Sequence, residues 1–251
     1  MPRGAGLPSV GGMDTNHPAV AIVTGASRGL GQALARSLAT AGYSLVVDAR
    51  GTGAVEAAAV ELRERAWVEA VPGDITDPAH RRDLIEAALR LGGPDLLINN
   101  AGTLGASPLP PLAEYPLDDL RHALETNVVA PIALTQLALP ALRERGGAVC
   151  NITSDAAVEP YEGWSGYGAG KAALDQASHI LAAEETGVRV WWVDPGDMRT
   201  RMHADAFPDE DISDRPLPEK ITPAFLRLFG ERPASGRYRA ADLLPSTPAG
   251  V

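Results

Sequence analysis

The sequence has a single cysteine, few aromatic side chains and no long apolar run. Only 5% of its 251 residues are aromatic, and Cys150 is the one cysteine. One cysteine cannot form an intramolecular disulfide, so we expect a reducing compartment and a cytoplasmic location. Cys150 lies in an apolar stretch that reads as a buried strand, where a packing role is expected. No segment reaches the roughly 20 apolar residues of a membrane helix, and we predict no membrane span.

The sequence also has fewer basic than acidic residues. The chain carries 22 Lys and Arg against 32 Asp and Glu, a formal net charge of -10. This balance argues against a nucleic-acid partner, whose phosphates require a basic surface. We predict no metal site. Residues 1–18 contain Gly, Pro and Ser without the apolar core of a secretory signal, and we expect a flexible tail there.

Short apolar runs alternate with amphipathic stretches along most of the chain. The amphipathic stretches read as helices, with 117–129 and 131–145 as two separate ones. The apolar runs read as strands, at 20–23, 44–47, 67–71, 96–98, 148–152 and 188–193. This alternation predicts an α/β fold: a Rossmann-like three-layer sandwich with a single doubly wound parallel sheet and helices on both faces.

The pattern weakens after Pro195. Residues 203–222 are rich in Asp, Glu and Pro, which suits either a disordered loop or a substrate lid. We predict a lid within 197–230 and a last strand near 238–240. No domain boundary is apparent, so residues 19–251 are expected to form one dinucleotide-binding and catalytic domain.

A glycine cluster joins the first expected strand to the first helix. It reads Thr24-Gly25-Ala26-Ser27-Arg28-Gly29-Leu30-Gly31. Glycines here permit a tight turn and a close approach of the backbone to a pyrophosphate, and the helix N-terminus offers free N–H groups. A glycine cluster alone is also what an ordinary turn contains, but its place after the first strand favours phosphate binding.

Tyr167 and Lys171 are four residues apart in an expected helix and therefore lie on one face. A free tyrosine has a pKa near 10, too high for a base at neutral pH. A unit charge about 4 Å away is worth roughly 4 kcal/mol at an effective dielectric near 20, enough to lower that pKa by two or three units. Ser154 follows a buried strand, at the sheet edge where open α/β sheets bind ligands.

Together these motifs resemble the short-chain dehydrogenase/reductase family. Asn99-Asn100-Ala101-Gly102, Asn127 and Pro195-Gly196 match the same family at their places in the order. The resemblance implies hydride exchange between a nicotinamide and a small carbonyl or alcohol substrate. It makes Tyr167 the acid/base, Lys171 the group that lowers its pKa and holds the ribose, Ser154 the substrate clamp and Asn127 the support of a water relay.

The same resemblance suggests which residues bind the cofactor. Thr200 would contact the carboxamide, and Asp74 and Asn99 correspond to adenine-side and sheet-bracing positions. The full set is Gly25, Ser27, Arg28, Gly29, Leu30, Gly31, Ala49, Arg50, Asp74, Ile75, Asn99, Ala101, Gly102, Tyr167, Lys171, Pro195, Gly196, Met198 and Thr200.

The end of the second strand bears on the choice of nicotinamide. NAD-preferring members place an acidic residue where this chain has Ala49. Arg50 follows it, and Arg28 lies in the glycine loop; two guanidinium groups suit a ribose 2′-phosphate. We therefore predict NADP rather than NAD, although the Asp48 carboxylate could face the same pocket.

Asp155 stands where small neutral residues are more usual in the family. We expect it to point away as a loop carboxylate; pointing inward, it would favour a cationic substrate or raise the Tyr167 pKa. Tyr161, Glu162 and Trp164 precede the expected catalytic tyrosine and are candidate substrate contacts.

Family members commonly pair the two long helices expected at 131–145 and 167–184, so we expect a homodimer or homotetramer. Two alternative functions stay open: an NAD-dependent alcohol dehydrogenase, and a non-catalytic nucleotide sensor on the same fold. The complete Asn-Ser-Tyr-Lys set favours an enzyme.

Overall fold

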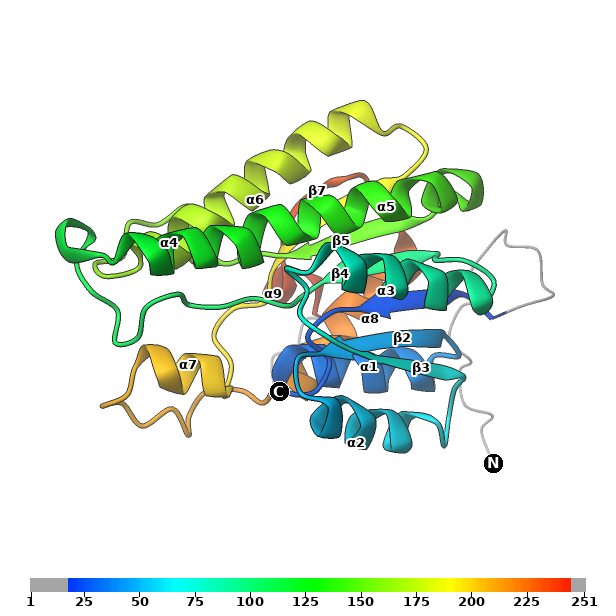
Figure 1. The fold of residues 1–251 in the computed structure, drawn as a ribbon, viewed down its shortest axis with the longest axis horizontal. Helices are drawn as coiled ribbons and strands as arrows, with labels where there is room; N and C mark the ends of the chain where they lie inside the picture. The colour runs from blue at the N-terminus through cyan, green and yellow to red at the C-terminus, as the bar shows by residue number, and fades with distance from the viewer. Residues whose placement is uncertain (1–17, 245–251) are drawn as a thin grey trace, which may run out of the picture.

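The computed structural model describes residues 18–244, so the expected tail at 1–18 lies outside the described residues except for Pro18. Seven parallel strands form one sheet in the order β3-β2-β1-β4-β5-β6-β7 (Figure 1). The strands are β1 Val20–Val23, β2 Ser44–Ala49, β3 Val68–Pro72, β4 Leu96–Asn99, β5 Ala148–Ile152, β6 Arg189–Asp194 and β7 Gly236–Arg239.

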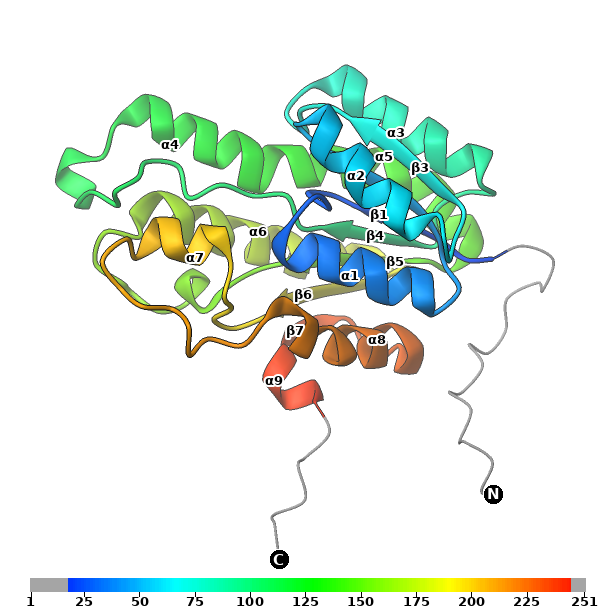
Figure 2. The same cartoon turned by 90° about the horizontal axis from the view of Figure 1, so that it is seen from below.

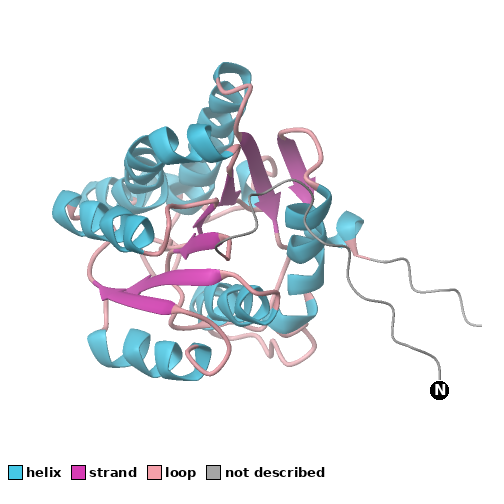
Figure 3. Cartoon of the chain, turned by 90° about the vertical axis from the view of Figure 1, so that its right-hand side faces the viewer, coloured by secondary structure: helices cyan, strands magenta, loops and turns pink. Residues whose placement is uncertain are grey.

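Helices cover both faces of the sheet because the central strands are apolar on both sides. Every residue of β1 is buried: Ala21 and Val23 pack with α1, α2 and α8, whereas Val20 and Ile22 pack with α3 and α5. Figure 2 shows α1 and α8 crossing one face, and Figure 3 shows helices on either side of the strands. The helices are α1 Gly29–Thr40, α2 Thr52–Leu62, α3 Pro78–Arg90, α5 Ala130–Arg145, α6 Ser165–Glu184 and α8 Thr222–Glu231. The doubly wound sandwich predicted from the sequence is confirmed.

The order of the strands locates the ligand site. β1 pairs with β2 on one side and with β4 on the other, Val23 lying opposite both Val47 and Ile98. The connections that follow β1 and β4 therefore run to opposite sides, and a crevice opens between them at the carboxyl ends of the strands.

The two helices expected at 117–129 and 131–145 are continuous. α4 (Leu117–Leu124) runs through a π-helical turn, Glu125–Val129, directly into α5. Pro131 sits in the first turn of α5 and does not interrupt the helix. The wider π-turn just before it relaxes the hydrogen-bond ladder where proline supplies no N–H, so the expected break is absent.

The segment 197–230, predicted as a lid, includes a helix that belongs to the core: α8 starts at Thr222. α7 (Arg201–Ala206) and the loop behind it lie beyond the carboxyl ends of the strands (Figure 1). α8, in contrast, buries Phe225 and Leu228 in the core beneath the sheet. Its apolar pattern is only ten residues long and follows a polar stretch, so the sequence did not distinguish it from the lid. β7 and a short α9 (Ala240–Leu243) follow.

The membrane expectation can be compared with residues 18–244. None of the helices described there is both long enough and apolar enough to cross a bilayer.

Candidate active site

A cleft of about 730 Å³ opens at the carboxyl edge of the sheet. It extends from the glycine loop and the end of β2 to Ser154 and α7. Most of the residues expected from the sequence to bind cofactor or substrate line it: Gly25, Ser27, Arg28, Gly29, Leu30, Ala49, Arg50, Asp74, Ile75, Ala101, Gly102, Ser154, Tyr167, Lys171, Pro195, Gly196, Met198 and Thr200.

Two of the residues expected to contact the cofactor, Asn99 and Gly31, do not line this cleft. The Asn99 side chain is buried and donates to Asn151 Oδ1 at 2.7 Å, bracing β4 against β5. Its neighbour Asn100, just beyond the strand, lines the cleft instead. Gly31 packs against the loop, since a Cβ there would lie 2.4 Å from both Asn100 Nδ2 and Gly25 O.

Asn127 also lies outside the cleft wall, in the π-helical turn. Its side chain is 1% exposed and clamps the Thr103 backbone: Oδ1 accepts from the Thr103 N–H at 2.9 Å, and Nδ2 donates to the Thr103 carbonyl at 2.8 Å. A Cβ added to Gly102 would lie within 4 Å of both Asn127 Oδ1 and Lys171 Nζ. Asn127 is therefore close to the lysine, although its amide is committed to the loop.

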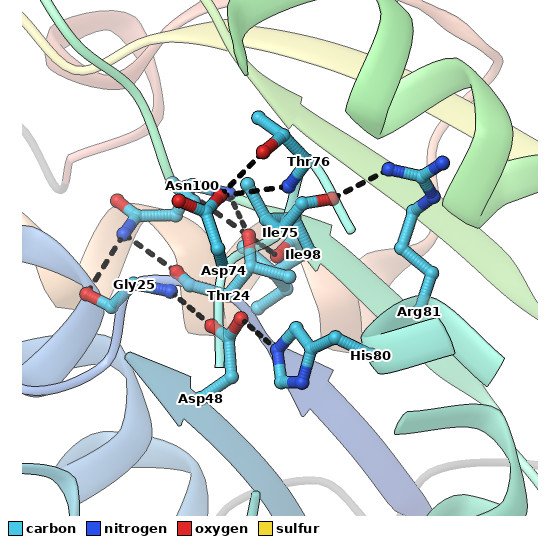
Figure 4. A network of polar contacts seen from close by, with 11 residues as sticks. Thr24, Gly25, Asp48, Asp74, Ile75, Thr76, His80, Arg81, Ile98 and Asn100 are labelled. Atoms are coloured by element: carbon cyan, nitrogen blue, oxygen red, sulfur yellow. Dashed lines mark hydrogen bonds and ion pairs between the residues drawn. The ribbon is translucent and has the colours of Figure 1, made fainter. Parts of the chain in front are cut away.

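The glycine loop is held from both sides (Figure 4). Gly25 has a φ of +67°, a left-handed conformation that favours glycine. Its N–H donates to Asp48 Oδ1 at 2.6 Å, while Asn100 Nδ2 donates to the Thr24 carbonyl at 2.8 Å. No side chain caps the start of α1, so its first N–H groups face the cleft as a ready anion site.

Asp48 lines the cleft together with Ala49 and Arg50, as the sequence allowed, but its carboxylate already has partners in the protein. The residue is 2% exposed. Its Oδ1 accepts from Gly25, and its Oδ2 lies 3.0 Å from His80 Nε2.

Ser154, Tyr167 and Lys171 meet at the other end of the cleft. Ser154 follows β5, and the other two lie one turn apart on α6. Lys171 Nζ is 5.4 Å from the centre of the Tyr167 ring and donates to the Ile152 carbonyl at 2.7 Å. The arrangement brings a hydroxyl, a phenol and an ammonium to one wall.

The protonation of this cluster differs from the expectation. Burial raises the pKa of Tyr167; a hydrogen bond with Ser154 opposes the shift, and Asp194 and Asp155 add to it. Burial lowers the pKa of Lys171 to about 8, with Asp175 acting in the opposite sense. Burial disfavours the charged phenolate, which keeps the proton on Tyr167.

Asp155 points toward Ser154, not away from it. Ser154 Oγ donates to its Oδ1 at 2.9 Å, and Tyr161 OH donates to its Oδ2 at 2.9 Å. The inward orientation of Asp155, which the sequence made the less expected of the two, is the one observed. Asp155 lines the cleft and contributes to the raised pKa of Tyr167.

An apolar wall encloses the substrate end. Leu104, Ala156 and Tyr167 form a small cluster against which Trp164 and Met202 pack. The Trp164 ring meets Tyr167 edge-on at 5.6 Å. Met202 belongs to α7, so this helix packs over the cluster that contains Tyr167. The sequence suggested Trp164, and Met202 falls within the lid predicted at 197–230; nothing in the local pattern indicated Leu104.

Comparison with known proteins identifies the family. The profile described as short chain dehydrogenase matches residues 19–211. The chain belongs to the short-chain dehydrogenase/reductase family. A rhamnolipid-biosynthesis 3-oxoacyl-[acyl-carrier-protein] reductase of Pseudomonas aeruginosa is 32% identical, covering 90% of this chain and 93% of that protein. Mouse (Mus musculus) sepiapterin reductase is 36% identical over 73% of this chain and 76% of its own length.

A solved relative extends the comparison to three dimensions. The structure of a short-chain dehydrogenase from Shigella flexneri, complexed with NADP, superposes with a TM-score of 0.82. The two sequences are 26% identical, and the alignment covers 92% of this chain and all of that one. This short-chain dehydrogenase/reductase is thus an oxidoreductase, as its sequence predicted.

Proposed function

We propose that this protein is an NADPH-dependent reductase of small carbonyl compounds, with Tyr167 as the proton donor. The observation that carries the proposal is the buried Tyr167 beside Ser154 and Lys171, in the same cleft as an uncapped glycine-loop helix. A protonated phenol favours reduction, because reduction of a carbonyl requires a proton for the oxygen.

The cleft fits a phosphorylated dinucleotide. The free N–H groups at the start of α1 suit a pyrophosphate. Arg28 and Arg50 both line the cleft, where they can meet a 2′-phosphate, and the two carboxylate oxygens of Asp48 are engaged by Gly25 and His80. The NADP bound to the relative from Shigella flexneri supports this choice.

In the mechanism we propose, NADPH would supply the hydride, and residues of the protein would hold and protonate the carbonyl oxygen of the substrate. Tyr167 OH donates its proton to the oxygen as negative charge develops there, and Ser154 Oγ holds that oxygen. The Lys171 ammonium binds the ribose and stabilises the phenolate that remains. Asn127 holds the Thr103 backbone and so keeps the loop beside Lys171 in place. In this position it supports the transfer of a proton from water back to Tyr167 after the reaction.

Apolar contacts define the substrate end. Leu104, Trp164 and Met202 exclude water from the position next to Tyr167, which strengthens its electrostatic interactions with the reacting oxygen. The wall suits a carbonyl carried on an apolar or aromatic body.

The test is a panel of aliphatic and aromatic ketones and aldehydes with NADPH and with NADH, followed by loss of absorbance of the reduced cofactor. We expect turnover of part of the panel, faster with NADPH. Tight binding of either nicotinamide without turnover of any substrate would favour a sensor, and a preference for NADH would favour the alcohol dehydrogenase.

A further inference from the structure

His80 is a buried polar side chain that the proposed mechanism does not use. It lies in the first turn of α3, which begins at Pro78 and is capped by the Asp77 side chain. The imidazole fills the space beside Gly73, where an added Cβ would lie 2.2 Å from Nδ1. The side chain is only 4% exposed, so its position is determined by packing.

The ring has a polar partner in the next layer. His80 Nε2 lies 3.0 Å from Asp48 Oδ2, and the Asp48 side chain is 3% exposed. Because an ionised carboxylate only accepts, Nε2 carries the proton of this bond. A buried carboxylate needs such donors, since an unpaired one would be costly.

Asp48 in turn holds the glycine loop by two bonds. Its Oδ1 accepts from the Gly25 N–H at 2.6 Å, and its backbone carbonyl accepts from the Ala26 N–H at 2.8 Å. The connection from α3 through β2 to the loop is continuous in Figure 4. Gly25 adopts a left-handed φ within this contact, so the bond fixes a conformation that an isolated glycine would leave freely.

We propose that His80 is a positioning residue for the pyrophosphate of the cofactor. By donating to Asp48 it orients the carboxylate that fixes Gly25. The proposal rests on the proposed binding of NADPH in this cleft. It predicts that loss of the donor weakens binding of the phosphates and leaves the chemical step unchanged.

The experiment compares His80→Leu, which retains volume without a donor, with His80→Gln, whose amide can reach Asp48. Leu84→Ala serves as a control: Leu84 is fully buried on the same helix, so it tests general loosening of α3. Binding is measured by calorimetry for NADPH, for 2′-phospho-ADP-ribose, which keeps the pyrophosphate, and for adenosine 2′-monophosphate, which lacks it.

We expect His80→Leu to weaken NADPH and 2′-phospho-ADP-ribose about 10-fold, equivalent to about 1.4 kcal/mol. Adenosine 2′-monophosphate should change by less than about twofold, a few tenths of a kcal/mol. His80→Gln should restore the affinity. At saturating NADPH, kcat should remain while KM for NADPH rises. Leu84→Ala should lower the melting temperature without this selective loss.

Unchanged NADPH affinity in His80→Leu, or an equal loss for all three ligands, would overturn the positioning role. The same holds if Leu84→Ala reproduces the selective pattern. If His80→Leu does not fold, His80→Asn, with a shorter reach than Gln, replaces it with the same expected loss. Failure of the unaltered protein to bind any nicotinamide would instead refute the proposed function.

Discussion

Tyr167→Phe is the sharpest perturbation of the proposed mechanism because it removes one hydroxyl and leaves the packing intact. The ring is 9% exposed and lies against Leu104, Ala156 and Trp164. A phenylalanine ring makes the same contacts. The lost hydroxyl takes with it one hydrogen bond with Ser154, so we expect a stability change of about 1 kcal/mol at most.

The effect on catalysis should be far larger. Loss of a positioned general acid costs about 10²–10⁴-fold in rate, which corresponds to about 3–5 kcal/mol of barrier. Cofactor affinity should survive, since the glycine loop lies at the other end of the cleft. The assay is single-turnover hydride transfer with NADPH saturating and a ketone chosen from the panel, beside calorimetric NADPH binding and a melting curve.

Each outcome has a separate meaning. A rate within about threefold of the unaltered protein, a difference far below that of general acid catalysis, would show that Tyr167 is not the proton donor. A matching loss of rate and melting temperature would indicate misfolding, and Trp164→Phe serves as the control because it alters the same wall without removing the acid.

Further predictions concern the residues around the tyrosine and the cofactor. NADPH affinity should fall as pH rises through about 8, because Lys171 is charged below its lowered pKa and loses the proton above it; calorimetry across pH 6–9.5 should show no such fall in Lys171→Met. Arg50→Ala should weaken NADPH by about 1.5–3 kcal/mol, the scale of charged hydrogen bonds, and leave NADH unchanged by the same assay. Ser154→Ala should lower kcat with NADPH affinity retained in steady-state kinetics. Light scattering at micromolar concentration should give a homo-oligomer, since α5 and α6 leave Leu137 and Ile180 exposed; a monomeric mass would contradict this.

The parallel sheet was predictable because its strands are short apolar runs with little polar interruption. Burial on both faces is what such runs require, and β1 and β5 are buried at every position. The helix 117–145 was harder. Proline at 131 usually marks a boundary, yet the helix continues through a π-turn just before it, which no residue pattern predicts.

Site residues were predictable to the extent that backbone position decides their direction. Gly25 and Tyr167 lie at a turn and on a helix face where the sequence fixes the outward side. Asn99 and Asn100 are adjacent and chemically identical, but their side chains point in different directions. Asn99 donates to Asn151, and Asn100 donates to the glycine loop at Thr24. A resemblance of motifs carries both residues without saying which one faces the cleft.

Asp155 shows why a departure from a familiar motif is hard to interpret without the fold. Its direction depends on Tyr161, six residues away, whose hydroxyl reaches back to Oδ2. Oδ1 faces Ser154, so the Ser154 hydroxyl donates its hydrogen bond to Asp155. To accept a hydrogen bond from Ser154, a ketone oxygen must first draw the hydroxyl away from Asp155, whereas an alcohol can donate its own proton to Ser154 Oγ. We therefore expect the carboxylate to affect how strongly ketones and alcohols are held next to Tyr167.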